Sequence, residues 1–176
     1  MRVEYLEDRK VDAALGAALR GLLSTCFTGE INAVFHHQRF FNAMPSHRWL
    51  IRDDAGLLAA HLAVHDKTLG TEVGDLRVGG VAEVCVAATH RGQGLVRQLL
   101  AEAHTWMIAQ GMAFSTLFGD ARVYGSSGYR KVENRVRYLD PKTGDWLTQR
   151  EDGFLIKPLG SLPWPEGVID LRGPKF

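Results

Sequence analysis

The stretch VCVAATHRGQGLVRQLL, at residues 84–100, constrains the fold of this chain more than any other part of the sequence. An apolar, β-branched run leads directly into a turn with two glycines, and apolar residues then recur at helical spacing. We therefore expect a strand, a tight turn, and a helix over residues 92–110 that Gly111 ends. A strand followed by such a helix favours a fold in which helices pack on a sheet.

The remaining elements are predicted by hydrophobic periodicity and by turn residues. We expect strands at residues 3–6, 49–52, 57–67, 78–86, 112–118, 130–138 and 154–157, and further helices at residues 12–26 and 120–128. This order describes an antiparallel meander that leads into a strand–helix–strand unit. It predicts an α/β or α+β fold with a mixed, mostly antiparallel central sheet flanked by helices.

The length of 176 residues suits a single domain that spans residues 1–176. Four of the six prolines lie at residues 158–176, so we expect this tail to be extended and not helical. Because the tail still contains Leu162, Trp164 and Ile169, we expect it to pack on the body of the domain.

Composition excludes several classes of protein. The formal net charge of +1 argues against a dedicated binder of nucleic acid or of anionic membranes, since both reward a basic surface. Cys26 and Cys85 form neither a disulfide framework nor a zinc site, and no apolar run is long enough to span a membrane. The charged start of the chain does not resemble a signal peptide. We therefore expect a soluble, cytoplasmic domain.

The two-glycine turn has a chemical interpretation as well as a structural one. Gly92 and Gly94 allow a tight turn and a close approach to the backbone amides, and Arg91 adds a fork of donors. A helix that begins there offers free N–H groups and a positive dipole end, which together suit a pyrophosphate. The alternative is a plain turn between a strand and a helix. The pattern is neither a P-loop nor a complete dinucleotide fingerprint.

A second motif follows about thirty residues later and gives the sequence a family resemblance. Arg91-Gly92-Gln93-Gly94, together with Tyr124 five residues before the aromatic residue of Gly128-Tyr129, resembles the GCN5-related N-acetyltransferases, the GNAT family. The resemblance covers most of residues 3–140 and implies the GNAT fold, acetyl-coenzyme A as co-substrate, and no metal. One departure is Val96, where the family usually has glycine or alanine.

Two branches of acyltransferases are similar in finer detail. The loop from Arg91 to Val96, Asp152-Gly153-Phe154 and Trp164 resemble the aminoglycoside 2′-N-acetyltransferases. The tail, with Trp164-Pro165, resembles the end of the NodA-type N-acyltransferases of chitooligosaccharides. Both acylate an amine of a sugar, so the resemblance implies an N-acetyltransferase that acts on an aminosugar, most like an aminoglycoside antibiotic. The alternatives are a NodA-like acyltransferase and a non-catalytic acyl-coenzyme A sensor.

The resemblance also implies roles for individual residues. The pantetheine arm would pair with the strand at Val84, Cys85 and Val86, and the phosphates would lie at the loop. The loop residues are Arg91, Gly92, Gln93, Gly94, Leu95 and Val96. Tyr124 would protonate the departing thiolate, because a phenol can donate a proton and a phenylalanine cannot; the alternative is a packed aromatic residue.

The general base has a less direct assignment. Glu83 lies among apolar neighbours in the expected strand, where a carboxylate is unusual. The aminoglycoside enzymes place this carboxylate one position earlier, at Ala82 here, and a shift of one residue changes the face of the strand unless a bulge intervenes. Glu83 is therefore either the base or the partner of an ion pair.

A cationic acceptor would need carboxylates around it. The resemblance assigns this part to Glu30, Asp152 and Asp170, and Trp164 would stack on a sugar ring; solvated acids and a packed tail are the alternatives. Arg122, Arg130 and Lys131 would either meet the 3′-phosphate of coenzyme A or form a solvated basic face. His36 and His37 lack a third spaced ligand, so we expect no metal. The expected partner is a small amine, and the family resemblance also allows a homodimer.

Overall fold

The computed structural model describes all residues, 1–176. The chain folds into two compact units. The first unit comprises Met1–His65 and Ala82–Ala103, and the second comprises Asp66–Val81 and His104–Phe176. Strands β3 (Leu58–Thr71) and β4 (Gly74–Val86) and helix α2 (Leu95–Ala109) contribute residues to both units. None of the helices has the length and the hydropathy that crossing a membrane requires.

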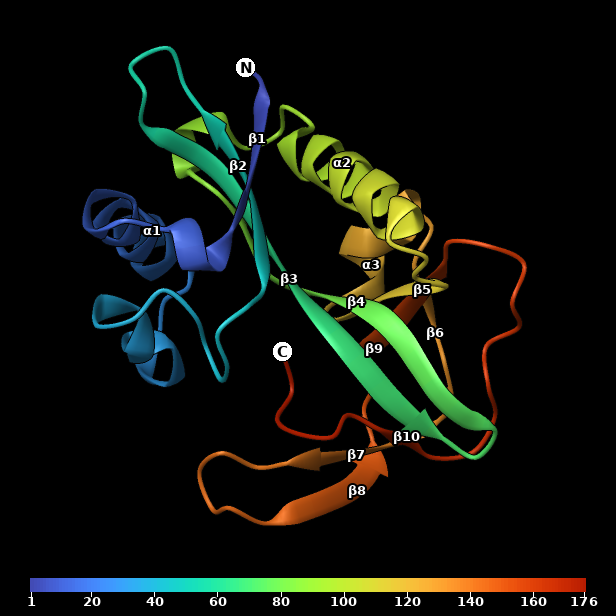
Figure 1. Ribbon diagram of the computed structural model, residues 1–176. Helices are drawn as coiled ribbons and strands as arrows, with labels where there is room; N and C mark the ends of the chain where they lie inside the picture. Colours follow the sequence, from blue (N-terminus) through green and yellow to red (C-terminus); the bar gives the residue numbers. More distant parts are fainter. The chain divides into compact units, whose positions relative to one another are not determined.

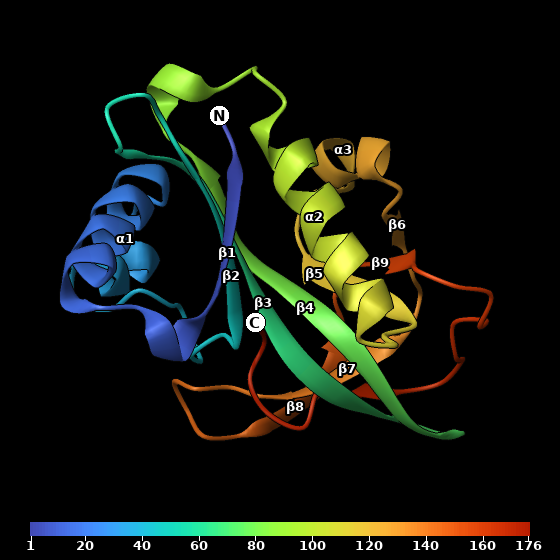
Figure 2. The ribbon, with the colours of Figure 1, turned by 45° about the horizontal axis from the view of Figure 1, so that its top comes forward.

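The first unit is built on three neighbouring antiparallel strands. Besides its parts of β3, β4 and α2, it contains β1 (Val3–Glu7), α1 (Ala13–Cys26), β2 (His47–Arg52) and the 3₁₀ helices Asp8–Lys10, Glu30–His36 and Ala88–His90. Strand β2 pairs with β1 on one side and with β3 on the other. In both views α1 lies on one side of these strands and the beginning of α2 on the other (Figures 1 and 2).

Local sequence explains the boundaries of these elements. The side chain of Asp12 accepts a hydrogen bond from the amide of Leu15 and so caps α1, as expected. The turn between β2 and β3 contains Gly56 at a φ of 80°, and the Asp53 carboxylate accepts hydrogen bonds from two amides of this turn. Leu22 and Leu23 of α1 pack against Phe35 in an apolar cluster of this unit.

The second unit contains most of the strands. Besides its parts of β3, β4 and α2, it holds β5 (Phe114–Phe118), α3 (Ala121–Tyr124), the 3₁₀ helix Gly125–Ser127, β6 (Arg130–Lys131), β7 (Arg135–Leu139), β8 (Trp146–Arg150), β9 (Phe154–Pro158) and β10 (Ile169–Asp170). Its strands follow the order β6-β9-β5-β4-β3-β10-β7-β8. Strands β4 and β5 are parallel, as are β10 and β7, whereas β5–β9, β6–β9, β7–β8 and β10–β3 are antiparallel.

The tail is extended and packs on this unit. Trp164 meets the ring of Phe114 edge-on at a centroid distance of 4.9 Å, and Phe176 packs in the same apolar cluster. Gly80 of β4 makes room for the Phe176 ring, because a Cβ at that position would lie 2.9 Å from a ring carbon. Apart from the short strand β10, the tail holds no regular element, and it forms no helix.

Most of the expected elements and the mixed, mostly antiparallel α/β class are confirmed. Three expectations need correction. Helix α2 begins at Leu95 and not at residue 92, because Gly92 and Gly94 both take a positive φ. The single strand expected over residues 130–138 is two strands, β6 and β7, which pair with different neighbours. Strands β8 and β10 and the 3₁₀ helix Glu30–His36 were not expected. The single domain stays a prediction.

Candidate active site

The turn before α2 presents exposed backbone at the N-terminus of a helix. Arg91, Gly92, Gln93 and Gly94 are all exposed, and φ is 75° at Gly92 and 74° at Gly94. A Cβ at either glycine would meet nothing within 4 Å, so the glycines are required by conformation and not by crowding. The turn therefore places two exposed, positive-φ glycines directly before a 15-residue helix, an arrangement that suits an anion.

The helix that follows fixes this turn on the protein. Leu95 is buried and Leu99 and Leu100 continue the apolar stripe, while Val96 is half-buried. The Nε of Arg91 donates a hydrogen bond of 3.4 Å to the carbonyl of Val86, which ties the turn to the end of β4. The guanidinium of Arg91 stays exposed. The six predicted loop residues are therefore adjacent in space as well as in sequence.

The backbone of strand β4 is irregular at Glu83. This residue has a φ of 53°, a left-handed conformation that a residue with a side chain rarely adopts. The three residues after it are the predicted pantetheine-binding segment, in which Val84 and Val86 are half-buried and Cys85 is buried. Like a β-bulge, such an irregularity can change the face of the sheet toward which the following side chains point.

The side chain of Glu83 joins a buried network centred on Arg48. The Arg48 side chain is fully buried, and its Nε donates a 2.5 Å hydrogen bond to Asp8, which is also buried. Its Nη1 donates to the Nε2 of His61 at 2.8 Å and to Glu83 at 3.4 Å. Its Nη2 donates to the main-chain carbonyl of Arg39 at 2.8 Å, and the Arg39 side chain also pairs with Asp8.

The protonation of these groups follows from their burial and their partners. Burial raises the pKa of Glu83 to about 7, against the opposing charge of Arg48 and the 2.8 Å hydrogen bond from the amide of Phe41. Burial and the charge of Arg48 lower the pKa of His61 to about 3. Burial of Asp8 is outweighed by hydrogen bonds from Arg39 and Arg48, which keep its pKa below the usual value. His61 is therefore neutral, with its Nδ1 donating to the Glu83 carbonyl.

The structure shows that Glu83 has an ion-pair partner, one of the two roles that its sequence left open. A carboxyl group with a pKa of about 7 also has the proton affinity that a general base needs near neutral pH. Sequence reasoning did not find Asp8, Arg48 or His61. The available signal was weak: Arg48 precedes the apolar run Trp49–Ile51 and His61 interrupts the apolar first half of β3, but their partners lie far away in the sequence.

Tyr124 lies at the end of α3 in the second unit. Asp120 caps this short helix, and the Tyr124 ring packs so close to Gly119 that a Cβ there would approach a ring carbon to 2.7 Å. The ring also meets Tyr129 in a T-shaped contact with centroids 6.0 Å apart. Tyr129 is buried, and its hydroxyl is hydrogen-bonded to Ser115 at 2.6 Å and to His104 at 2.9 Å. Tyr124 is thus held by its neighbours and remains half-buried.

The predicted acceptor residues occupy different environments. Glu30 is exposed in the first unit. In the second unit, Asp152 is fully exposed and 3.2 Å from Lys131, whereas Asp170 pairs with Arg137 at 2.6 Å. Trp164 donates a 2.7 Å hydrogen bond to Asn134, so the packed-tail interpretation describes its geometry. No hydrogen bond or ion pair joins the side chains of Asp152, Trp164 and Asp170 to one another.

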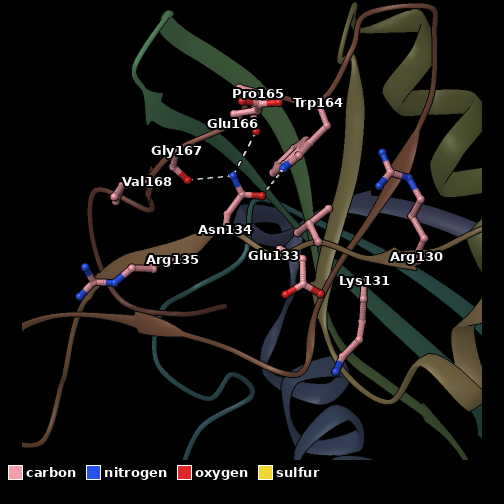
Figure 3. Close-up of a pocket in the computed structure, with 11 residues that line it drawn as sticks. Arg130, Lys131, Glu133, Asn134, Arg135, Trp164, Pro165, Glu166, Gly167 and Val168 are labelled. Carbon is pink, nitrogen blue, oxygen red and sulfur yellow. Dashed lines mark hydrogen bonds between the residues drawn. The ribbon is translucent and has the colours of Figure 1, made fainter.

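Trp164 also lines an open cavity of about 620 Å³ in the second unit (Figure 3). The segment 130–135 forms one wall and the segment 164–168 the other. The amide group of Asn134 joins the walls, since it donates to the carbonyls of Pro165 and Gly167. The side chains of Arg130, Lys131 and Arg135 point in different directions from this wall (Figure 3). The cavity therefore has no convergent set of charges.

No group of three or more histidine, cysteine or acidic residues is arranged to hold a metal ion. His36 and His37 are both exposed, at the end of the 3₁₀ helix Glu30–His36. Among the basic residues considered for the 3′-phosphate, Arg122 pairs with Asp120 and Lys131 with Asp152. Arg130 is exposed.

The strand, turn and helix described here are typical of domains that hold a phosphorylated cofactor at a helix N-terminus. The chain belongs to the GNAT family: residues 9–132 match the model of the acetyltransferase (GNAT) domain, and the fold is that of N-acetyltransferases. The expected family and the expected class of enzyme are thereby confirmed. No curated protein matches the chain.

Solved structures of the family share the fold at low sequence identity. The GNAT family N-acetyltransferase YhbS from Escherichia coli, in complex with coenzyme A, has a TM-score of 0.70 at 22% identity, over 97% of this chain and 90% of that one. A GNAT acetyltransferase from Brucella melitensis, in complex with acetyl-coenzyme A, has a TM-score of 0.61 at 15% identity and covers 94% of both chains. Eis1 from Mycobacterium abscessus has a TM-score of 0.60 at 14% identity, over 73% of this chain and 32% of that one.

Proposed function

We propose that this chain transfers the acetyl group of acetyl-coenzyme A to an amino group of an aminosugar, most like an aminoglycoside. The observation that carries the proposal is the exposed turn from Arg91 to Gly94, with two positive-φ glycines at the start of α2. Its open amides and its arginine suit a pyrophosphate. The complexes of the two similar enzymes with coenzyme A and acetyl-coenzyme A support this assignment.

The cofactor supplies an acetyl thioester when it is bound, and the residues of the chain supply proton transfers and positioning. We assign Arg91, Gly92, Gln93, Gly94, Leu95 and Val96 to the phosphates, and Val84, Cys85 and Val86 to the pantetheine arm. A main-chain amide of β4 would stabilise the negative charge that develops on the carbonyl oxygen. The amine attacks directly in a ternary complex, so no acyl-enzyme is required.

Two side chains are assigned to proton transfer. Glu83 accepts the proton of the attacking ammonium group, and its pKa of about 7 supports this role because the carboxyl group is partly ionised near neutral pH. Tyr124 donates a proton to the departing thiolate, and its half-buried position at the end of α3 supports this assignment. The acceptor-binding roles of Glu30, Asp152, Asp170 and Trp164 rest on the resemblance to aminoglycoside enzymes. The exposure of Glu30 and Asp152 suits contact with a cationic acceptor.

The test is a screen of aminoglycosides and chitosan oligomers with acetyl-coenzyme A, in which thiol release is measured. Calorimetric titration with coenzyme A on the same protein measures cofactor binding separately. We expect binding and turnover with at least one aminoglycoside. Turnover only of chitosan oligomers, and with longer acyl donors, would support the NodA-like alternative. Binding without turnover would support a sensor, and the absence of binding would refute the proposal.

A further inference from the structure

The two cysteines, which lie 59 positions apart in the sequence, meet in the first unit. Cys26 is the last residue of α1, and Cys85 is the second-to-last residue of β4. Both belong to one apolar cluster, Cys85 as a buried member and Cys26 packed against that cluster, and neither is in a disulfide. The Cys26 thiol also donates a hydrogen bond of 3.4 Å to the carbonyl oxygen of Val86. Two cysteines that pack together can form a disulfide once their Cβ atoms come within reach of one another.

The surroundings of the two thiols differ in a chemically useful way. Cys26 is half-buried, while Cys85 is only 6% exposed. The Nε of Arg91 donates to the same Val86 carbonyl that Cys26 approaches, so a positive charge lies beside Cys26. The hydrogen bond from Cys85, with a smaller contribution from Arg91, lowers the pKa of Cys26 to about 6. The same hydrogen bond and burial raise the pKa of Cys85.

We propose that Cys26 and Cys85 form an oxidant-sensitive pair that reacts with hydroperoxides, with Cys26 as the attacking thiol and Cys85 as the resolving thiol. This property goes beyond the proposed acetyl transfer and does not depend on it. Three features of the structure carry it: the packing of the two cysteines in one cluster, the Arg91 side chain at the Val86 carbonyl that Cys26 also approaches, and the difference in their exposure. Reactive cysteines in proteins lie in partly exposed, electropositive surroundings of this kind.

The reaction proceeds in two steps. The Cys26 thiolate attacks one oxygen of the peroxide, the O–O bond breaks, and the leaving hydroxide takes a proton to become water. Cys26 is now a sulfenic acid. The Cys85 sulfur then attacks the Cys26 sulfur, the S–O bond breaks, and the hydroxide leaves with the proton of Cys85 as a second water. Two thiols are oxidised to one disulfide while one hydrogen peroxide is reduced to two waters.

The second step is favoured by the first. The hydrogen bond with Cys26 and burial raise the pKa of the Cys85 thiol, and the negative charge of Cys26 adds to the rise. Oxidation of Cys26 to the neutral sulfenic acid removes that charge, so Cys85 becomes easier to deprotonate at the moment when it must attack. The same arrangement makes Cys85 a poor first nucleophile.

The test treats the reduced full-length chain with hydrogen peroxide and follows it by intact mass and by thiol titration. We expect the wild-type protein to lose the mass of two hydrogen atoms and both titratable thiols, and to regain them with a dithiol reductant. Cys85→Ser, which keeps a hydrogen-bond donor, is expected to stop at a sulfenic acid on Cys26 that dimedone traps. Cys26→Ser is expected to react at least tenfold more slowly, with circular dichroism confirming that both variants are folded.

Alkylation by iodoacetamide as a function of pH gives an independent measurement that needs no oxidation. We expect the half-maximal alkylation rate of Cys26 near pH 6 in the wild-type protein, and at higher pH in Arg91→Gln. The proposal is wrong if Cys26→Ser oxidises as fast as the wild-type protein. It is also wrong if the wild-type protein accumulates sulfinic acid in place of the disulfide, or if Cys26 is alkylated with the pH dependence of an ordinary cysteine.

Discussion

Arg48 carries a full positive charge in the interior of the first unit, where its side chain has no exposed area. A buried charge is costly unless partners surround it, and here two carboxylates, a histidine and a main-chain carbonyl accept its hydrogen bonds. A buried ion pair adds little stability compared with apolar residues, but the removal of one partner leaves the other charges uncompensated. Arg48 is therefore required because its loss would leave the carboxylates of Asp8 and Glu83 buried without a positively charged partner.

We expect Arg48→Gln to destabilise the protein by about 3 kcal/mol, because Asp8 and Glu83 would lose their buried cation. Arg52→Gln is the matched control, since Arg52 lies on the same strand and pairs with Glu4 at 3.3 Å but is 34% exposed. An exposed pair of this kind contributes about 0–1 kcal/mol. Urea unfolding of the three proteins measures the difference. Equal losses in the two variants would contradict the interpretation of the network.

The assignment of Tyr124 can be tested at the same scale. Tyr124→Phe removes only the phenolic hydroxyl, so we expect kcat to fall about 100-fold with little change in the KM for acetyl-coenzyme A. Tyr129→Phe is the control, because its hydroxyl is buried on Ser115 and His104. That variant is expected to lose about 1 kcal/mol of stability and to keep its kcat. An unchanged kcat in Tyr124→Phe at every pH would remove Tyr124 from the proton transfer.

The sequence identified single residues better than it identified their partners. Glu83 stood out because it is a carboxylate in an apolar strand, yet its partner Arg48 is 35 positions away. The left-handed conformation of Glu83 is set by tertiary packing and has no local signal such as glycine. The contact between Cys26 and Cys85 was not expected for the same reason. Spacing in the sequence does not report which side chains meet when their elements are separated by other strands and helices.

At the scale of elements, the turn before α2 offers a test that separates conformation from binding. Gly94→Ala puts a Cβ on a residue with a φ of 74°, which costs about 1–2 kcal/mol. We expect that loss of stability and a roughly tenfold higher KM for acetyl-coenzyme A, equivalent to about 1.4 kcal/mol of binding energy. The distorted turn would no longer present its amides in the required geometry.

Gly111 provides the control for this change. It has a φ of 73°, and a Cβ there would also meet nothing within 4 Å, but it follows the other end of α2. Gly111→Ala is expected to lose a similar stability in thermal unfolding and to keep the KM of the wild-type protein. If both variants changed the KM equally, the effect would come from general destabilisation and the turn would have no special role.

Elements with strong local signals were predicted well, and elements that depend on distant partners were not. Helix α1 has its cap at Asp12, and the hairpin between β2 and β3 has its turn at Gly56. Strand β10 has two residues and exists because the tail lies between β7 and β3. The break between β6 and β7 likewise reflects a change of pairing partner, from β9 to β8 and β10. No periodicity in so short a segment carries that information.

At the scale of the whole molecule, buried titratable groups link folding stability to pH in opposite directions. Glu83 has a folded pKa of about 7 and an unfolded value of 4.5, so its contribution to stability is present at low pH and is lost as the pH rises through 7. His61 and His104 have folded pKa values of about 3 and about 4, against 6.5 when unfolded. Below pH 6.5 the unfolded chain binds protons that these buried histidines do not, so stability falls as the pH falls.

Between about pH 5 and pH 6 each of these groups changes the unfolding free energy by up to about 1.4 kcal/mol per pH unit, with Glu83 opposing the two histidines. Glu83→Gln removes the opposing contribution, so its stability should fall more steeply with acidification than that of the wild-type protein, by about one proton equivalent. His61→Gln should fall less steeply by the same amount. The burial of Asp8 is outweighed by hydrogen bonds from Arg39 and Arg48, which hold its pKa below the usual value, so Asp8 does not titrate in this range; all other groups are common to the proteins compared. Urea unfolding at several pH values measures the slopes, and parallel slopes in Glu83→Gln and the wild-type protein would show that Glu83 is ionised in the folded state across this range.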